Sequence, residues 1–251
     1  LGVFFDRKEE KNPFEISPLD RFHYKQKAQH LPMQKVLEKA KASERLPPGL
    51  FQEHAALKLI QEEALCENAL SYFGLEKKEL QELSKHLVLP MGQKQISLTC
   101  SFTSILDNGR GIFIDGEAKK SQMIRMWPVV LAYLCYSDTS SCSIYFTNKG
   151  KPKSMAISLK DPAADLLHFI AYYSLGKNHL SPMIPFVAEE LLWKDEAAFL
   201  QKLEGWQRQK DPYITWLFPF VEENTIFDTT SIWRDWKPYL DSVFSSLKEI
   251  F

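Results

Sequence analysis

The sequence predicts an α/β fold in which a mixed sheet is flanked by helices and followed by a C-terminal helical extension. Two pairs of segments rich in β-favouring residues predict the sheet, because a turn joins the segments of each pair. A helical segment separates the two pairs. Apolar residues at helical spacing predict further helices before the first pair and after the second. The expected arrangement is therefore an α/β core with helices at both ends.

The N-terminal part is predicted to be helical. Ser17 is placed as an N-cap and Pro18 as the first residue of a short helix, and a second helical stretch covers about 32–42. The lead-in over residues 1–15 is mixed and charged.

A firm break at Leu46-Pro-Pro-Gly49 introduces a long helix over 50–73, which Gly74 ends. The pattern over 76–87 predicts another amphipathic helix.

The first predicted hairpin joins a strand over 95–106 to a return strand over 112–115. Its turn is Asp107-Asn-Gly-Arg-Gly111, and Asn-Gly accepts positive φ at both central positions. A helix over 121–136 follows, in which Pro128 predicts either a kink or the true start.

The second predicted hairpin joins strands over 142–147 and 154–159. Asp161-Pro162 then caps a helix that ends at Gly176, and only helical segments follow residue 177. The predicted domains are the lead-in, a core over 16–176, and a helical extension over 177–251 that packs on the core. The chain begins without Met, which suggests a piece of a longer polypeptide.

Composition restricts the function. The chain has 251 residues, of which 31 are basic and 32 acidic, for a net charge of −1. A domain that grips duplex DNA alone usually carries a basic excess, so any nucleic-acid contact must be a local patch or be shared with a partner. The four cysteines form no CxxC pair, which indicates free thiols in a reducing compartment, the cytoplasm, and no zinc or iron–sulfur site. No apolar run is long enough to span a membrane.

One motif carries candidate chemistry. The apolar strand over 112–114 leads directly to Asp115, followed by Glu117-Ala-Lys119. A metal-dependent nuclease of the restriction-endonuclease type needs converging carboxylates and a lysine around the scissile phosphate, because Mg²⁺ prefers oxygen ligands. These residues could supply part of such a site.

The pattern resembles the RecB-type branch of the PD-(D/E)xK nucleases, with departures. His54 follows a Gly on a helix, as in that branch, and Gln122 opens the helix after the site. The resemblance aligns Thr103 with the first acid of the family. The hydroxyl of Thr103 ligates Mg²⁺ poorly. Asp115 is kept, but Glu117 stands where the family has Lys. The resemblance therefore implies a degenerate site that holds no metal.

An alternative reading keeps a Mg²⁺-dependent nuclease. Glu117-Ala-Lys119 is itself an acid-x-Lys triplet, shifted by two residues, and Asp107 would be its first acid. We disfavour it because Asp107 begins the turn at the hairpin tip. At about 3.3 Å per strand residue, that offset is too long for one metal ion to bridge.

Each candidate also has a structural reading. His54 is expected to be a core or half-exposed histidine. Asp115 and Glu117 would be solvated carboxylates, with Glu117 pairing Lys119 or Lys120.

The alternating lysines of the second hairpin are either a solvated turn or a contact to the DNA backbone; they are Lys149, Lys151 and Lys153. The C-terminal aromatic residues are mostly core, or in part a partner-facing patch; they are Trp206, Trp216, Phe218, Phe220, Trp233 and Trp236.

The chain is similar to the family of C-terminal domains of RecC. RecC is the gamma subunit of exodeoxyribonuclease V. Four stretches in order carry the likeness, over 16–22, 46–51, 127–133 and 232–236. The resemblance implies a restriction-endonuclease-like fold without nuclease activity and without a cofactor of its own. It also implies RecB-like and RecD-like helicase partners, and a role in subunit assembly and DNA strand handling during double-strand-break repair.

Overall fold

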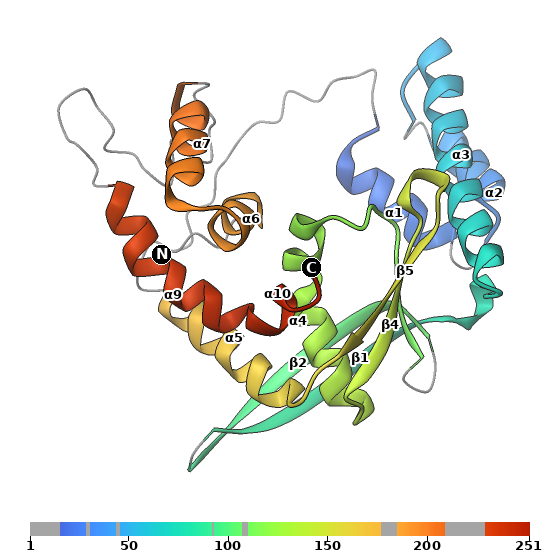
Figure 1. The fold of residues 1–251 in the computed structure, drawn as a ribbon. Coiled ribbons are helices and arrows are strands. Elements are labelled where there is room, and N and C mark those ends of the chain that lie inside the picture. The colour runs from blue at the N-terminus through green and yellow to red at the C-terminus, as the bar shows by residue number, and fades with distance from the viewer. Residues whose placement is uncertain are drawn as a thin grey trace. The chain divides into compact units, whose positions relative to one another are not determined.

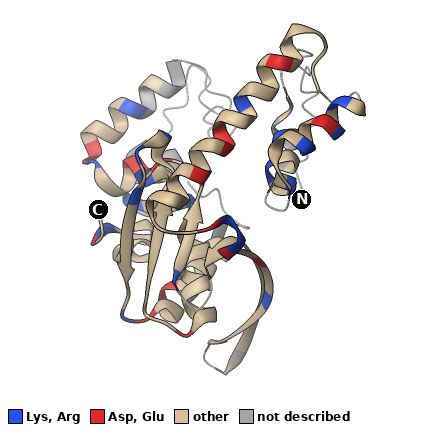
Figure 2. Cartoon of the chain, turned by 90° about the vertical axis from the view of Figure 1, so that its right-hand side faces the viewer, with Lys and Arg blue, Asp and Glu red and all other residues tan. Residues whose placement is uncertain are grey.

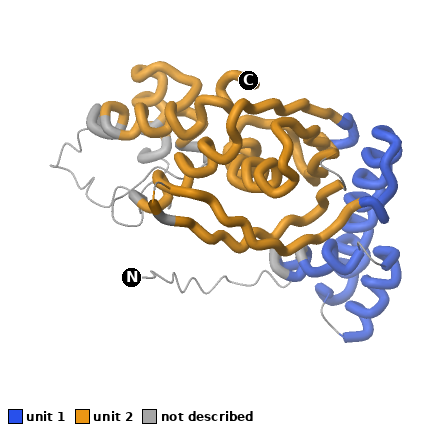
Figure 3. Tube along the Cα trace, turned by 90° about the horizontal axis from the view of Figure 1, so that it is seen from below, with its two compact units in different colours: residues 1–79, 149–152 blue, residues 80–148, 153–251 orange. Residues whose placement is uncertain are grey.

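A computed structural model describes residues 16–28, 31–43, 46–91, 93–106, 110–176, 185–208 and 229–251 (Figure 1). The chain forms two compact units (Figure 3). Unit 1 comprises residues 1–79 and 149–152, and unit 2 comprises residues 80–148 and 153–251. The predicted boundary at residue 177 stays a prediction. The helices after that residue share one hydrophobic cluster with the sheet, whereas the N-terminal helices have a cluster of their own.

Unit 1 contains helices α1 (Pro18–Ala28), α2 (Met33–Ala42) and α3 (Leu50–Tyr72). The predicted N-cap is confirmed, because the backbone N–H of Asp20 donates to Ser17 Oγ at 3.0 Å. The helices enclose a small buried cluster of mainly aliphatic side chains, which comprises Tyr24, Ala28, Met33, Val36, Leu37, Ala40, Leu46 and Leu59.

Ion pairs attach α3 to its neighbours in unit 1. Glu62 pairs with Arg21 and, at 3.1 Å, with Lys25 of α1. Glu63 pairs with Lys77. Figure 2 shows acidic residues along the long helix α3 and several basic residues on the shorter helices of unit 1.

The prediction of a helix over 76–87 is wrong. A short 3-10 turn, η1 (Lys77–Glu79), leads into strand β1 (Leu80–Met91). The leucines of this segment fit a helical face in the sequence. However, the strand pairs with β2 from Leu80 to Met91, and this long-range pairing overrides local helix propensity.

Unit 2 is built on a five-stranded mixed sheet with the order β1-β2-β3-β4-β5. After β1, its strands are β2 (Lys94–Leu106), β3 (Gly111–Ile114), β4 (Ser141–Phe146) and β5 (Lys153–Ser158). Both predicted hairpins are confirmed, since β2–β3 and β4–β5 pair antiparallel. Strands β3 and β4 are parallel, and helix α4 (Lys120–Ser137) connects them. The tip of the first hairpin, residues 107–109, lies outside the described residues.

A glycine permits the parallel pairing at the start of β3. A Cβ on Gly111, which has φ +151°, would lie 2.0 Å from the carbonyl oxygen of Ser143 in β4. The buried hydroxyl of Tyr133 donates to Leu106 O at 3.0 Å and accepts from Gly111 N–H at 3.2 Å. Helix α4 is thereby attached to both strands of the first hairpin.

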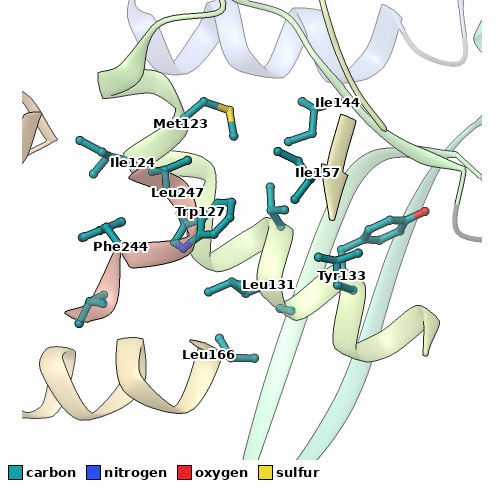
Figure 4. Packing of buried hydrophobic residues seen from close by; sticks show 14 of the residues in the cluster. Met123, Ile124, Trp127, Leu131, Tyr133, Ile144, Ile157, Leu166, Phe244 and Leu247 are labelled. Carbon is teal, nitrogen blue, oxygen red and sulfur yellow. The ribbon is translucent and has the colours of Figure 1, made fainter. Parts of the chain in front are cut away.

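Helix α4 forms the centre of the main core. Met123, Trp127 and Leu131 are fully buried and contact the sheet on one side and later helices on the other (Figure 4). Pro128 lies inside the helix, so it does not mark the helix start.

The C-terminal helices complete this core. They are α5 (Pro162–Gly176), α6 (Pro185–Trp193), α7 (Glu196–Arg208), α9 (Thr229–Val243) and α10 (Ser245–Lys248). The predicted cap of α5 is confirmed, because Ala164 N–H donates to Asp161 Oδ1 at 3.0 Å. Residues 177–184 and 209–228 lie outside the described residues.

Asp241 joins α9 to α10. Its Oδ1 accepts hydrogen bonds from Lys237 Nζ at 2.9 Å and Lys248 Nζ at 2.7 Å. Partial burial acts to raise the pKa of Asp241, but the hydrogen bonds and charges of the two lysines outweigh it. The pKa of Asp241 therefore lies below its usual value.

We predict that Asp241→Asn lowers the free energy of unfolding at neutral pH by a few tenths to about 1 kcal/mol, because the carboxylate is 37% exposed and water screens the pair. The folded pKa is lowered, so the difference is full above about pH 4 and disappears as the pH falls through the folded pKa. Urea unfolding across this range measures it. A difference that persists unchanged into acid would contradict the account.

Candidate functional site

Asp115 occupies the position that the sequence predicts. Strand β3 lies in the middle of the sheet, between β2 and β4, and all four of its residues are buried. Asp115 follows directly and is exposed, at the start of the loop that leads to α4. The central strand therefore delivers a carboxylate to the edge of the sheet.

Hydrogen bonds attach this loop to the residues that follow β4. The hydroxyl of Thr147 lies 3.3 Å from both Asp115 Oδ1 and Gly116 O. Asn148 N–H donates to Gly116 O at 2.9 Å, and Ala118 N–H lies 3.4 Å from Asn148 Oδ1. We call residues 115–118 and 147–148 the clasp.

Thr147 is the central residue of the clasp. Thr147 is only 4% exposed and, tyrosines aside, is the one buried polar residue in the described part of the chain. Its backbone N–H donates to Ile114 O at 3.2 Å, which continues the pairing of β3 with β4. Because a buried hydroxyl needs a hydrogen-bond partner, Asp115 and Gly116 have a structural role here.

Glu117 and Lys119 form an ion pair, as one structural reading expected. The Lys119 side chain is 65% exposed, whereas that of Glu117 is 20% exposed. Lys120 instead lies over the ring of Trp193, with Nζ 4.7 Å from the centroid. The lysine of the shifted acid-x-Lys triplet thus contacts its own acid.

Gln122 lies beside the same loop. A Cβ built on Gly116 would lie 3.8 Å from Cδ and Nε2 of Gln122, in the first turn of α4. The amide therefore borders the position that the family resemblance assigns to the site.

Thr103 lies at a β-bulge. The pairing of β1 with β2 shifts between Gln81↔Ile105 and Leu83↔Phe102, so β2 has one extra residue there. Ser104 has φ +58°, which accommodates the bulge. Thr103 is exposed and lies two residues before Ile105, which pairs with Ile112 of β3.

His54 is exposed on α3 rather than buried or half-buried. It belongs to unit 1, whereas Thr103, Asp115, Glu117 and Gln122 belong to unit 2. Asp107 lies outside the described residues. Over the ranges that the structure describes, no three His, Cys, Asp or Glu side chains gather closely enough to hold a metal ion.

The second hairpin presents three exposed lysines. Lys149 and Lys151 lie in its turn and Lys153 begins β5. Asn148 and Lys149 have φ +46° and +53°, a conformation that non-glycine residues seldom adopt.

Two of the predicted core aromatics pack as expected. Trp233 lies 5.8 Å from Phe199 and Trp236 lies 6.0 Å from Tyr172, measured between ring centroids, and both rings border the main core. The side chain of Trp206 and the residues at 216, 218 and 220 lie outside the described part. All four cysteines are free thiols, as expected.

The family model described as the RecC C-terminal domain matches residues 1–196. The chain belongs to the RecC C-terminal domain family. No curated protein matches it. Membership in this family implies a role in the RecBCD complex and in DNA repair. Among the described residues of this RecC-type domain, no helix has the length and apolar character needed to cross a membrane.

Sequence reasoning missed Thr147 and Asn148. Their only local signal is a polar pair where an apolar strand meets a Lys-Gly turn, and this pattern also fits an ordinary hairpin. Their importance comes from β3, which lies beside β4 although α4 separates them in the sequence.

We predict that Thr147→Val destabilises the domain by about 1 kcal/mol, because the methyl keeps the shape of the side chain but loses the hydroxyl. For a chain of this size, the expected fall in Tm is about 2–4 °C. Amide exchange at Ala118 and Asn148 should also become faster. Thr147→Ser is the matched control, since it keeps the hydroxyl and should keep both amides protected. Equal protection in Thr147→Val would contradict the clasp.

Proposed function

We propose that the chain is a catalytically inactive, nuclease-like domain of the RecC subunit of a RecBCD-type exodeoxyribonuclease V. Its role is subunit assembly and DNA strand handling during double-strand-break repair. The clasp is the observation that supports this proposal most. In it, Asp115 accepts a hydrogen bond from Thr147 at the position where a nuclease would ligate a metal.

The chemistry of the neighbouring positions supports inactivity. Thr103 supplies a neutral hydroxyl where the family pattern has an acid, and Mg²⁺ sites normally use two or more carboxylates. Glu117 stands at the lysine position of the pattern and pairs with Lys119. We therefore propose no metal or other cofactor for this domain.

The order of elements supports a restriction-endonuclease-like fold. The β2–β3 hairpin carries Thr103 and leads to Asp115, and the next helix carries Gln122 near its start. A mixed sheet flanked by helices is the arrangement that the resemblance implies.

Exposed apolar side chains on α3 support a role in assembly. Leu50, Leu57 and Tyr72 are 83%, 57% and 71% exposed. At 100° per residue these three positions lie within about 60° on one side of the helix. The side chains of α3 that are fully buried lie elsewhere around it. Exposed apolar side chains aligned along one side of a helix can serve as separate contact points for a partner, and RecB-like and RecD-like subunits are the proposed partners.

The hairpin lysines are proposed DNA contacts within the complex. Lys149 and Lys151 are exposed on the turn, and Lys153 is exposed at the start of β5. Lysine neutralises phosphate charge and releases counterions.

Co-expression with RecB-like and RecD-like subunits tests the function. We predict that the chain co-purifies with them in a stoichiometric complex. Replacing Leu50, Leu57 and Tyr72 together with Ser should reduce its recovery in the complex at least tenfold. The matched control replaces the exposed Leu31, Val88 and Met91 with Ser and should retain assembly. A chain that elutes alone at every concentration would contradict the proposal.

The alternative function is a Mg²⁺-dependent nuclease that uses Asp115, Glu117 and Lys119, and the retained acid and ion pair favour it. We predict no cleavage of linear duplex or single-stranded DNA above background with Mg²⁺ or Mn²⁺. Cleavage that Asp115→Ala abolishes would establish the alternative and overturn the inactive assignment.

A further inference from the structure

Helices α1 and α2 carry a local excess of positive charge. Their basic residues are Arg21, Lys25, Lys27, Lys35, Lys39 and Lys41, and their acidic residues are Asp20 and Glu38. Six positive and two negative charges give a net charge of +4, whereas the whole chain has a net charge of −1. The rest of the chain is therefore acidic overall, and these two helices differ from it.

Only part of this charge is used inside the fold. Arg21 and Lys25 share the carboxylate of Glu62 on α3. The remaining cations are the α1–α2 lysines, which we define as Lys27, Lys35, Lys39 and Lys41. All four are exposed, and within the described ranges none forms an ion pair with an acidic side chain.

The two helices hold these lysines in fixed positions. The opposite side of α2 is buried through Met33, Val36, Leu37 and Ala40, and α1 contributes Tyr24 to the same cluster. At 100° and about 1.5 Å per residue, Lys35 and Lys39 lie about 40° apart around α2 and about 6 Å apart along its axis, whereas Lys41 lies about 120° around the helix from Lys35. Phosphates follow each other at about 3.4 Å per strand along a duplex axis, so Lys35 and Lys39 can face two neighbouring phosphates.

We propose that the α1–α2 lysines bind the phosphate backbone of DNA. Binding would be independent of sequence, because lysine acts on phosphate as a point charge and contacts to phosphate carry no direct sequence information. The proposal rests on the proposed function in strand handling and adds the surface that carries it. It also explains how a nearly neutral chain can contact DNA without a basic excess.

The test measures the salt dependence of DNA binding by the full 251-residue chain. Fluorescence anisotropy with labelled duplex and single-stranded oligonucleotides gives affinities between about 50 and 200 mM KCl. Each lost phosphate contact lowers the slope of log affinity against log salt by about 0.9 on duplex and 0.7 on single strands. With all four lysines changed to Gln, the duplex slope should fall by at least about 2, and affinity at low salt at least tenfold.

Two further variants control for charge and location. Changing Lys58, Lys160, Lys194 and Arg234 to Gln removes the same charge from exposed positions elsewhere, and the slope should change by less than about 1. Changing Lys149, Lys151 and Lys153 to Gln tests the hairpin separately. Circular dichroism and Tm, equal to those of the parent chain, show that each variant folds.

Three results would overturn the proposal. In the first, the α1–α2 variant keeps the slope of the parent chain. In the second, the charge-matched variant loses as much slope as the α1–α2 variant. In the third, the hairpin variant alone loses the whole slope. An α1–α2 variant that binds DNA normally but fails to co-purify with the RecB-like and RecD-like subunits would assign these lysines to an acidic protein surface instead. If the parent chain assembles and the α1–α2 variant keeps the parent slope, only this inference is overturned. If the parent chain fails to assemble but the α1–α2 variant shows the expected fall in slope, only the proposed function is overturned.

Discussion

The close approach of β3 to β4 at Gly111 is the constraint on which the rest of unit 2 depends. The ideal Cβ of any other residue at position 111 would lie 2.0 Å from Ser143 O, so a side chain there would force the two strands apart. The hydroxyl of Tyr133 bonds both Leu106 and Gly111, and this fixes α4 over the start of the same strand. With both contacts in place, β3 lies in the middle of the sheet and its last residue, Ile114, leads Asp115 to the edge beside β4.

That placement explains how Asp115, which we propose to occupy a nuclease-like position, can have a structural role. The parallel register sets Ile114 opposite Phe146, so the residues that follow each strand meet at the same edge. There the buried hydroxyl of Thr147 lies within hydrogen-bonding distance of Asp115 and Gly116, and Asn148 hydrogen-bonds to the backbone of the same loop. This contact gives the Asp115 carboxylate a hydrogen-bond partner within the fold.

Local signals in the sequence predict the elements better than the site. The cap at Ser17, the cap at Asp161 and both hairpins follow from short-range rules, and the structure confirms them. The segment over 76–87 fails because its strand state is set by pairing with residues that come after it in the chain. The clasp also cannot be predicted locally, since it joins residue 115 to residue 147 across a whole helix. His54 belongs to unit 1 and the other described candidate positions belong to unit 2, a division that no motif indicates.

We propose that Asp115 serves the clasp and not a metal ion. Calorimetric titration of the domain with Mn²⁺, compared between the parent chain and Asp115→Asn, tests this most directly. The account predicts no stoichiometric heat of binding in either protein, together with a lower Tm for Asp115→Asn because the hydroxyl of Thr147 loses a charged acceptor. One-to-one Mn²⁺ binding by the parent chain that Asp115→Asn removes would contradict it.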